Sequence, residues 1–279
     1  MKIALSIAGS DSGGGAGIQA DLLTFAAHGI HGTCAITAIT AQNTVAVAAW
    51  KALEPGLVRA QIEAVADDME ISALKTGLLA NQAIIEEVAA IVAARGFENL
   101  VVDPVMVAGS GDRLLDPNAE AAYLEHLFPL AALVTPNIPE AELLLSRQIR
   151  SVSEMKEAAM SLARLGCRAV LVKGGRLEGD PTDVLWDGTT LHVLETPRID
   201  TPNTHGAGCT YSAAITSRMA YGHDVETSVR GAKQYLTSSI QEGYSPGRGH
   251  GPVRHLNSGA VSALGRATGP HKRSILRSD

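Results

Sequence analysis

The chain has 279 residues and a formal net charge of −6; 46% of its residues are hydrophobic but only 4% are aromatic. This apolar content supports a sizeable core, and the acidic balance argues against a general nucleic-acid-binding protein, whose surface is usually basic. Residues 1–9 are too short an apolar run for a signal peptide, no stretch reaches the roughly 18 apolar residues of a membrane span, and the three scattered cysteines form no CxxC pair. A location in the reducing cytoplasm, away from any membrane, is expected.

Apolar runs of strand length recur along the first two thirds of the chain. Because helical patterns separate them, they predict a mainly parallel sheet with helices on both faces, that is, a three-layer α/β/α fold. The predicted strands are Ile3–Ala8, Thr33–Thr40, Ala73–Thr76, Leu100–Val102, Leu133–Thr135 and Ala169–Val172.

Helical patterns fill the intervals between these runs. Ser153 is expected to cap the last of these helices and Gly166 to end it. The predicted helices are Gly17–His28, Pro55–Met69, Gln82–Ala94, Pro139–Leu145 and Ser153–Leu165.

The last third of the chain predicts a hairpin and two long helices. Asp183–Trp186 and Leu191–Leu194 pair through the turn at Asp187 and Gly188. The helices are expected over about Ala207–Tyr221 and Val225–Glu242. No linker or repeat interrupts residues 1–258, so one domain is predicted there, followed by a basic, frayed tail at 259–279.

Polar or glycine-rich segments follow five of the predicted strands. The carboxyl ends of parallel strands share one edge of a sheet, where ligands bind in open α/β folds. A single site at this edge is therefore predicted. The five segments are Gly9–Gly17, Gln42–Thr44, Asp103–Met106, Thr135–Asn137 and Lys173–Gly175.

The first of these segments, Gly9–Gly17, matches neither the P-loop nor the G-x-G-x-x-G dinucleotide fingerprint. Asp21 follows within the first turn of the next helix. The helix dipole stabilises an acidic side chain near a helix start. The neighbours of Asp21 predict that it points toward the site.

The segment Asn203–Thr210 is the most informative in the chain, because glycines open a helix there. Gly206 and Gly208 allow the backbone to approach a ligand closely, and the unpaired amides and dipole at a helix start favour an anion. The same field favours a thiolate at Cys209. The segment therefore predicts an anion hole beside a base, as phosphoryl transfer requires.

Three further side chains suit such a transfer through charge. Asp103 and Glu140 offer carboxylates that can order water around Mg²⁺, with Asn137 one helical turn before Glu140. Lys173, which precedes two glycines, is expected to contact a phosphate. The polar stretch Gly109–Arg113 is expected to act as a lid that excludes water.

These features together predict a phosphotransferase, with positioning and charge neutralisation as the main tasks of the protein. Two other functions stay open. Cys209 with His205 as its base suits acyl transfer by a cysteine hydrolase. A non-catalytic sensor that binds a small molecule without turnover is the other alternative.

Seven segments in order make the chain resemble the ribokinase-like superfamily, and within it the hydroxymethylpyrimidine/phosphomethylpyrimidine kinases of thiamine biosynthesis. They extend over nearly all of residues 3–255, and as an ordered set they are highly specific. They are residues 7–21 (IAGSDSGGGAGIQAD), 40–44 (TAQNT), 103–106 (DPVM), 135–141 (TPNIPEA), 172–175 (VKGG), 203–210 (NTHGAGCT) and 249–253 (GHGPV).

The resemblance implies a three-layer ribokinase-like fold, a homodimer, and ATP and Mg²⁺ as cosubstrate and cofactor. It implies two successive phosphorylations of a pyrimidine alcohol, to the monophosphate and then the pyrophosphate. The resemblance also implies roles for particular residues. Catalysis would fall to Cys209 as base, the amides of Gly206 and Gly208, and Lys173; pyrimidine binding to Gln42, Asp21, Val105 and Gly9; ATP binding to Lys173, Thr135, Asn137 and Thr204; and Mg²⁺ support to Asp103 and Glu140.

The nearest rival is a pyridoxal kinase of the same superfamily. Some pyridoxal kinases place a second cysteine in the lid, and Val105–Leu115 contains none. This difference favours the pyrimidine substrate. Ala207 departs from the threonine that relatives often carry, which removes a hydroxyl but leaves the backbone amides.

Overall fold

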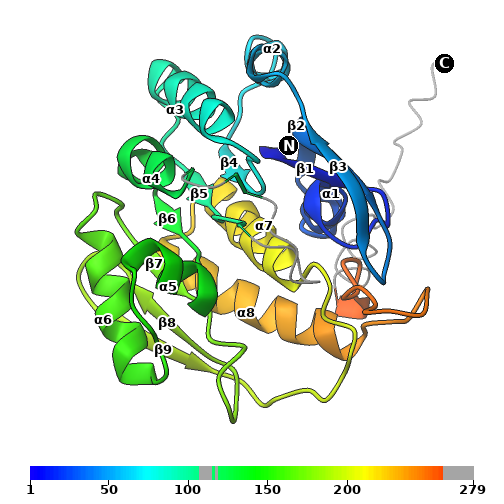
Figure 1. Ribbon diagram of the computed structural model, residues 1–279, viewed down its shortest axis with the longest axis vertical. Helices are drawn as coiled ribbons and strands as arrows, with labels where there is room; N and C mark the ends of the chain where they lie inside the picture. The colour runs from blue at the N-terminus through cyan, green and yellow to red at the C-terminus, as the bar shows by residue number, and fades with distance from the viewer. Residues whose placement is uncertain (107–114, 117–118, 260–279) are drawn as a thin grey trace, which may run out of the picture.

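The computed structural model describes residues 1–106, 115–116 and 119–259, and a nine-stranded sheet forms its centre (Figure 1). The strand order is β3-β2-β1-β4-β5-β6-β7-β8-β9. The strands are β1 Ile3–Asp11, β2 His31–Gln42, β3 Val47–Ala52, β4 Ala73–Thr76, β5 Leu100–Val102, β6 Leu133–Val134, β7 Val170–Val172, β8 Thr182–Trp186 and β9 Leu191–Glu195.

The six central strands, from β2 to β7, are parallel, which confirms the predicted mainly parallel sheet. Antiparallel strands close both edges, β3 beside β2 and the β8–β9 hairpin beside β7. The carboxyl ends of the parallel strands therefore share one edge, where the sequence places its polar segments.

Helices cover both faces of the sheet and complete three layers. α1, α7 and α8 pack on one face, and α2, α3, α5 and α6 on the other; α2 and α3 lie side by side at the top of Figure 1. The helices are α1 Gly17–Ala27, α2 Pro55–Ala66, α3 Gln82–Arg95, α4 Glu120–Ala122, α5 Ile138–Leu145, α6 Val152–Ala163, α7 Ala207–Ala220 and α8 Val225–Gln241, with a π-helical turn η1 at Tyr123–Leu127 and a 3₁₀ turn η2 at Phe128–Leu130.

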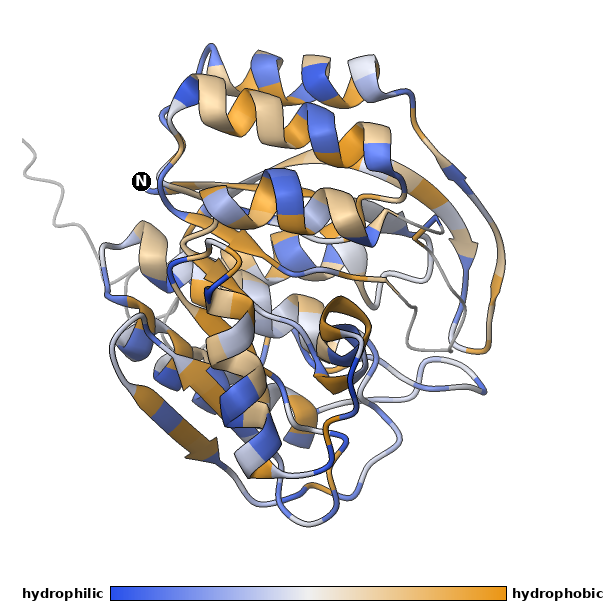
Figure 2. Cartoon of the chain, turned by 60° about the vertical axis from the view of Figure 1, so that its left-hand side comes forward, coloured by the Kyte–Doolittle hydropathy of each residue, from blue (hydrophilic) through white to orange (hydrophobic). Residues whose placement is uncertain are grey.

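The core follows from strand alternation. Leu100 and Val102 of β5 pack beneath α3 and α5, whereas Val101 between them packs beneath α7. Both faces of the sheet are thus buried, as a parallel sheet requires. Figure 2 shows apolar residues concentrated on the strands and on the helix sides that meet them.

The structure adds two elements that were not predicted and corrects one helix cap. β3 was not predicted, because its alanines and single lysine carry little strand signal; it forms by pairing with β2 as an edge strand. The helical segment 120–130 was missed as well. Ser151, not Ser153, caps α6, and its hydroxyl accepts the Glu154 amide at 3.2 Å.

None of the helices in the described ranges combines the length and apolar character needed to cross a lipid bilayer. The predicted lid at 109–113 and, apart from Gly259, the predicted tail lie outside the described residues.

Candidate active site

A cavity of about 520 Å³ opens at the carboxyl ends of the parallel strands, a size typical of small-molecule sites. Most of the predicted site residues line it, although they come from six separate segments. Those lining it are Gly9, Gln42, Asp103, Val105, Asn137, Glu140, Lys173, Thr204, Gly206, Gly208 and Cys209.

An unpredicted carboxylate organises the first loop. Asp11 accepts hydrogen bonds from the amides of Gly13 and Ala16, each at 2.8 Å, and Gly15 at 3.1 Å. The imidazole Nε2 of His205 lies 2.8 Å from the same carboxylate. Burial alone would raise the pKa of Asp11, but these hydrogen bonds hold it below its usual value.

This network joins the glycine-rich loop to the segment before α7, and the contact leaves no space for side chains. Gly206 has a φ of +75°, and a Cβ there would lie 1.8 Å from the carbonyl oxygen of Gly15. Gly17 has a φ of +58°, and its Cβ would lie 2.3 Å from the carbonyl oxygen of Gly9. Glycine is required at both positions.

The N-terminus of α7 faces the cavity as predicted, with Gly206 as its N-cap. The Thr210 amide makes the first helical hydrogen bond, to the Gly206 carbonyl at 2.9 Å. The Ala207 amide donates to the Thr204 carbonyl at 3.1 Å. A Cβ at Gly208 would lie 3.5 Å from the Lys173 Nζ. Amides and an ammonium group thus converge where a phosphate would be held.

The predicted preference of Cys209 for the thiolate is wrong for the site as its own residues build it. Burial raises the pKa of the Cys209 thiol to about 11, and this outweighs the opposing effect of the Lys75 ammonium. The helix start alone does not compensate for lost solvation.

Asp103 lies at the centre of a polar cluster at the end of β5. Its Oδ1 accepts from the Lys173 Nζ at 2.7 Å and from the Thr135 hydroxyl at 3.0 Å, and its Oδ2 from the Ser212 hydroxyl at 3.2 Å. Burial alone would lower the pKa of Lys173, but Asp103 and Glu140 raise it above its usual value.

Thr135 was predicted to contact ATP, but it is 1% exposed and does not line the cavity. Its hydroxyl donates a hydrogen bond to Asp103, so it positions that carboxylate instead.

Glu140 caps its own helix and also lines the cavity. Its carboxylate accepts the Asn137 amide at 2.8 Å, and the Asn137 side chain accepts the Glu140 amide at 3.0 Å, a reciprocal capping box. Burial raises the pKa of Glu140 to about 7, although Lys173 opposes the rise. The residue therefore has both a structural role and a place beside Asp103.

Asp21 was predicted to bind the substrate, but it is fully buried and does not line the cavity. Its Oδ1 pairs with the Lys75 ammonium at 2.8 Å and its Oδ2 accepts the Ser6 hydroxyl at 2.6 Å. The helix turns this side chain toward the sheet. A charged residue inside the β4 run, Lys75, was the sequence signal for this pair.

Gln42 keeps the freedom to meet a ligand. It is half-buried at the end of β2, and its side-chain contacts to Thr40 and His205 are long, at 3.3 and 3.4 Å. Its amide offers both a donor and an acceptor.

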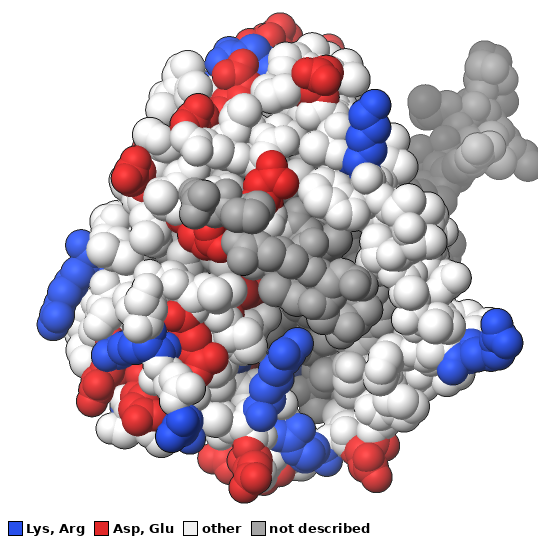
Figure 3. Space-filling model, viewed as in Figure 1, with Lys and Arg blue, Asp and Glu red and all other residues white. Residues whose placement is uncertain are grey.

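Charges of both signs are interspersed on the face seen in Figure 3. Positive side chains also reach the cavity itself: Lys173, Arg176, Arg198 and Lys233 are among its lining residues. An anionic ligand is therefore matched locally rather than by a basic surface.

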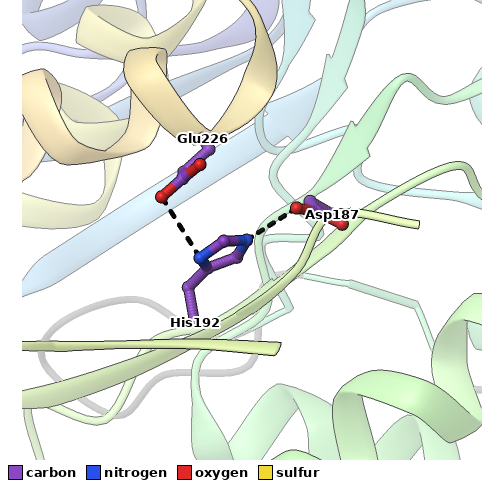
Figure 4. A group of neighbouring side chains, drawn as sticks. All are labelled: Asp187, His192 and Glu226. Atoms are coloured by element: carbon purple, nitrogen blue, oxygen red, sulfur yellow. Dashed lines mark hydrogen bonds and ion pairs between the residues drawn. The ribbon is translucent and has the colours of Figure 1, made fainter. Parts of the chain in front are cut away.

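A cluster of one histidine and two carboxylates lies apart from the cavity lining, at Asp187, His192 and Glu226 (Figure 4). The ring Nε2 lies 2.6 Å from Asp187 and the Nδ1 lies 3.2 Å from Glu226. Because the two carboxylates engage opposite ring nitrogens, a metal ion would have to displace one of them. The geometry fits a histidine that ties the β8–β9 hairpin to the start of α8.

Known proteins resemble this chain over nearly its whole length. A sequence model described as phosphomethylpyrimidine kinase matches residues 11–254. A hydroxymethylpyrimidine/phosphomethylpyrimidine kinase of Synechococcus elongatus is 48% identical over 258 residues, which cover 92% of this chain and 98% of that protein.

The chain belongs to the phosphomethylpyrimidine kinase family. Solved structures agree with this. The phosphomethylpyrimidine kinase of Clostridium difficile superposes with a TM-score of 0.78 at 42% identity, covering 86% of this chain and all of that one. The pyridoxal kinase of Staphylococcus aureus, in complex with AMP-PCP and pyridoxal, superposes with a TM-score of 0.86 at 34% identity, covering 93% and 95%. The fold is therefore ribokinase-like, and the activity of the family is that of a kinase.

Proposed function

We propose that this kinase uses ATP to phosphorylate 4-amino-5-hydroxymethyl-2-methylpyrimidine and then its monophosphate, in thiamine biosynthesis. The observation that carries the proposal is one cavity in which the N-terminus of α7, Cys209 and the Lys173–Asp103 pair converge. The 48% identity to a kinase named for both pyrimidine substrates supports the choice of substrate.

The positions of the residues in the cavity support the following proposed roles. Gln42 hydrogen-bonds the aminopyrimidine edge, beside Val105 and Gly9. Lys173, with Asn137 and Thr204 nearby, holds the phosphates of ATP. The amides at the start of α7 stabilise the negative charge of the transferring group.

The reaction transfers the γ-phosphoryl group of ATP to the substrate and removes a proton from the substrate hydroxyl. The substrate hydroxyl oxygen forms a bond to the γ-phosphorus of ATP, while the bond from that phosphorus to the ADP oxygen breaks. In this first transfer the thiolate sulfur of Cys209 accepts the hydroxyl proton. In the second transfer a phosphate oxygen of the monophosphate attacks the γ-phosphorus, and the bond from that phosphorus to the ADP oxygen breaks in the same way. Each turnover releases ADP.

Asp103 and Glu140 fit a role in supporting Mg²⁺. Both provide hard oxygen donors on the cavity wall, which Mg²⁺ prefers. The oxygens of Asp103 already accept three hydrogen bonds, so contact through retained waters suits the site better than displacement of its partners. Mg²⁺ would supply neutralisation of phosphate charge.

The test is ADP release from the purified protein with ATP, Mg²⁺ and either the pyrimidine alcohol or its monophosphate. Turnover of both substrates is expected. Turnover of neither, with the pyrimidine still binding, would replace the proposal with the sensor alternative.

Pyridoxal is a second candidate substrate, favoured by the likeness to the S. aureus pyridoxal kinase that holds pyridoxal. The same assay with pyridoxal decides it. Activity on pyridoxal alone would retain the phosphotransfer chemistry and change the substrate.

We also infer a cytoplasmic homodimer. Apolar side chains exposed along β2 and β3 support an association surface there: Ile39 is 52% and Trp50 36% exposed. Light scattering on the purified protein tests the oligomeric state.

A further inference from the structure

A lysine with no solvent exposure lies in the middle of the sheet. Lys75 belongs to β4, and its ammonium lies 2.8 Å from the Asp21 carboxylate of α1, which is equally buried. Ser6 of β1 donates to the other oxygen of Asp21 at 2.6 Å. The three residues thus form a buried cluster, in which one ion pair and one hydrogen bond share the Asp21 carboxylate.

The Lys75 ammonium lies just beneath the cavity floor. Lys75 is two residues after Ala73, so both point to the same face of the sheet, where Ala73 packs with Ala213 of α7. A Cβ at Gly77, which lines the cavity, would lie 3.7 Å from the Lys75 Nζ.

Cys209 approaches the same place from above. It precedes Ala213 by four residues on α7, so it lies on the helix face that packs against β1 and β4. Cys209 and Gly77 both line the cavity. The thiol and the buried ammonium are thus gathered at one end of the α7–sheet interface.

Stability alone gives no reason for an ion pair here. Burying two charges costs several kcal/mol of solvation, and well-packed apolar residues of similar volume are usually as stable or more so. We propose that Lys75, held in place by Asp21, is a positioning residue for the reaction, whose charge supports ionisation of the Cys209 base. The proposal rests on the proposed kinase function.

The charges that face Cys209 come from four elements. Asp21 of α1 and Asp103 after β5 raise the pKa of the thiol, whereas Lys75 of β4 lowers it and exceeds either carboxylate in effect. Lys173, after β7, interacts with the thiolate as well. Burial alone would lower the pKa of Lys75, but its anionic neighbours raise it to about 12, so the ammonium stays charged at neutral pH.

The experiment compares the parent protein with Lys75→Met, without nucleotide or substrate. Two readouts follow Cys209 alone: the alkaline titration of its Cβ resonance in isotopically labelled protein, and its alkylation rate by iodoacetamide, measured on the Cys209 peptide. Lys75→Met is expected to lower the thiolate fraction about tenfold or more, which moves the titration upward by at least about one pH unit.

Lys233→Met is the matched control, because it removes another buried lysine, paired with Asp183 at 2.7 Å on α8 and β8. It is expected to leave the Cys209 titration in place. If Lys75→Met fails to fold, the double variant Lys75→Met with Asp21→Asn avoids an unpaired buried carboxylate. This double variant is also expected to raise the titration midpoint, because Lys75 outweighs Asp21.

An unchanged Cys209 titration in the folded variant overturns the proposal, even if alkylation slows, since slower alkylation alone reports altered access. Kinase assays distinguish the effect of Lys75 on Cys209 from the proposed kinase function. A shifted titration with no kinase activity in the parent supports the Lys75 effect and refutes the proposed function. With an active parent, Lys75→Met is expected to lower kcat at least about tenfold and to leave the KM for ATP unchanged.

Discussion

Replacing Glu140 with glutamine is expected to stabilise the protein at neutral pH, although it impairs the site. The folded protein holds the Glu140 proton up to about pH 7, whereas the usual pKa of glutamate is near 4.5. Between these values the folded state binds more protons than the unfolded state, so the free energy of unfolding falls as pH rises. The difference between the two pKa values corresponds to a loss of about 3 kcal/mol in the free energy of unfolding, which is complete above pH 7.

Glu140→Gln removes this cost and keeps the helix cap, because the glutamine oxygen can still accept the Asn137 amide. Urea unfolding with a chelator present, at about pH 4 and about pH 8, provides the measurement. The variant is expected to match the parent at the lower pH and to exceed it at the higher pH by up to about 3 kcal/mol.

Glu154→Gln is the matched control. Glu154 holds the same position in the first turn of α6, but it is only half-buried, and backbone hydrogen bonds lower its pKa. This control is expected to lose a little stability at the higher pH, which is the opposite sign. A Glu140→Gln protein that gains nothing at about pH 8 would refute the burial argument.

Three further outcomes are expected. Cys209→Ala should lower kcat by about two orders of magnitude or more while calorimetry still detects ATP binding, because a general base is lost; near-normal turnover would remove Cys209 as the base. Gln42→Ala should weaken pyrimidine binding by about 1–3 kcal/mol, since a polar edge loses its partner; an unchanged KM for the pyrimidine contradicts this role. Asp187→Asn should cost about 1 kcal/mol in urea unfolding above about pH 4, because the hydrogen bond from His192 keeps the pKa of Asp187 far below its usual value; the cost should vanish in strong acid as Asp187 protonates, and a loss independent of pH would contradict the assignment.

The layered fold and the place of the site were predictable because they depend on repeated local patterns. Apolar strands alternate with amphipathic helices, and the polar segments after Gln42, Asp103 and Lys173 all reach one cavity. β3 was not predictable in this way, because an alanine-rich edge strand is specified by its neighbour β2 more than by its own residues.

The partners of charged residues could not be predicted, because they join segments distant in sequence. Asp11 and His205 are 194 residues apart, and Lys75 and Asp21 are 54 apart. The neighbours of Asp21 in the sequence predicted that it points toward the site, but the packing of α1 on the sheet turns it inward. The pKa of Cys209 likewise depends on burial, which the glycine-rich motif does not specify.

The distribution of charge explains why a half-buried thiol can serve in a cavity with several carboxylates. Asp103 and Glu140 suit Mg²⁺, but their charge opposes ionisation of a neighbouring acid, and Asp103 raises the pKa of Cys209. A solvent-exposed lysine would be screened, and Lys173, which lines the cavity, is proposed to hold the phosphates of ATP. A cation beneath the cavity floor leaves the cavity free for substrate. The Lys75–Asp21 pair has this position, so the same burial that costs solvation preserves the effect of the ammonium on the thiol.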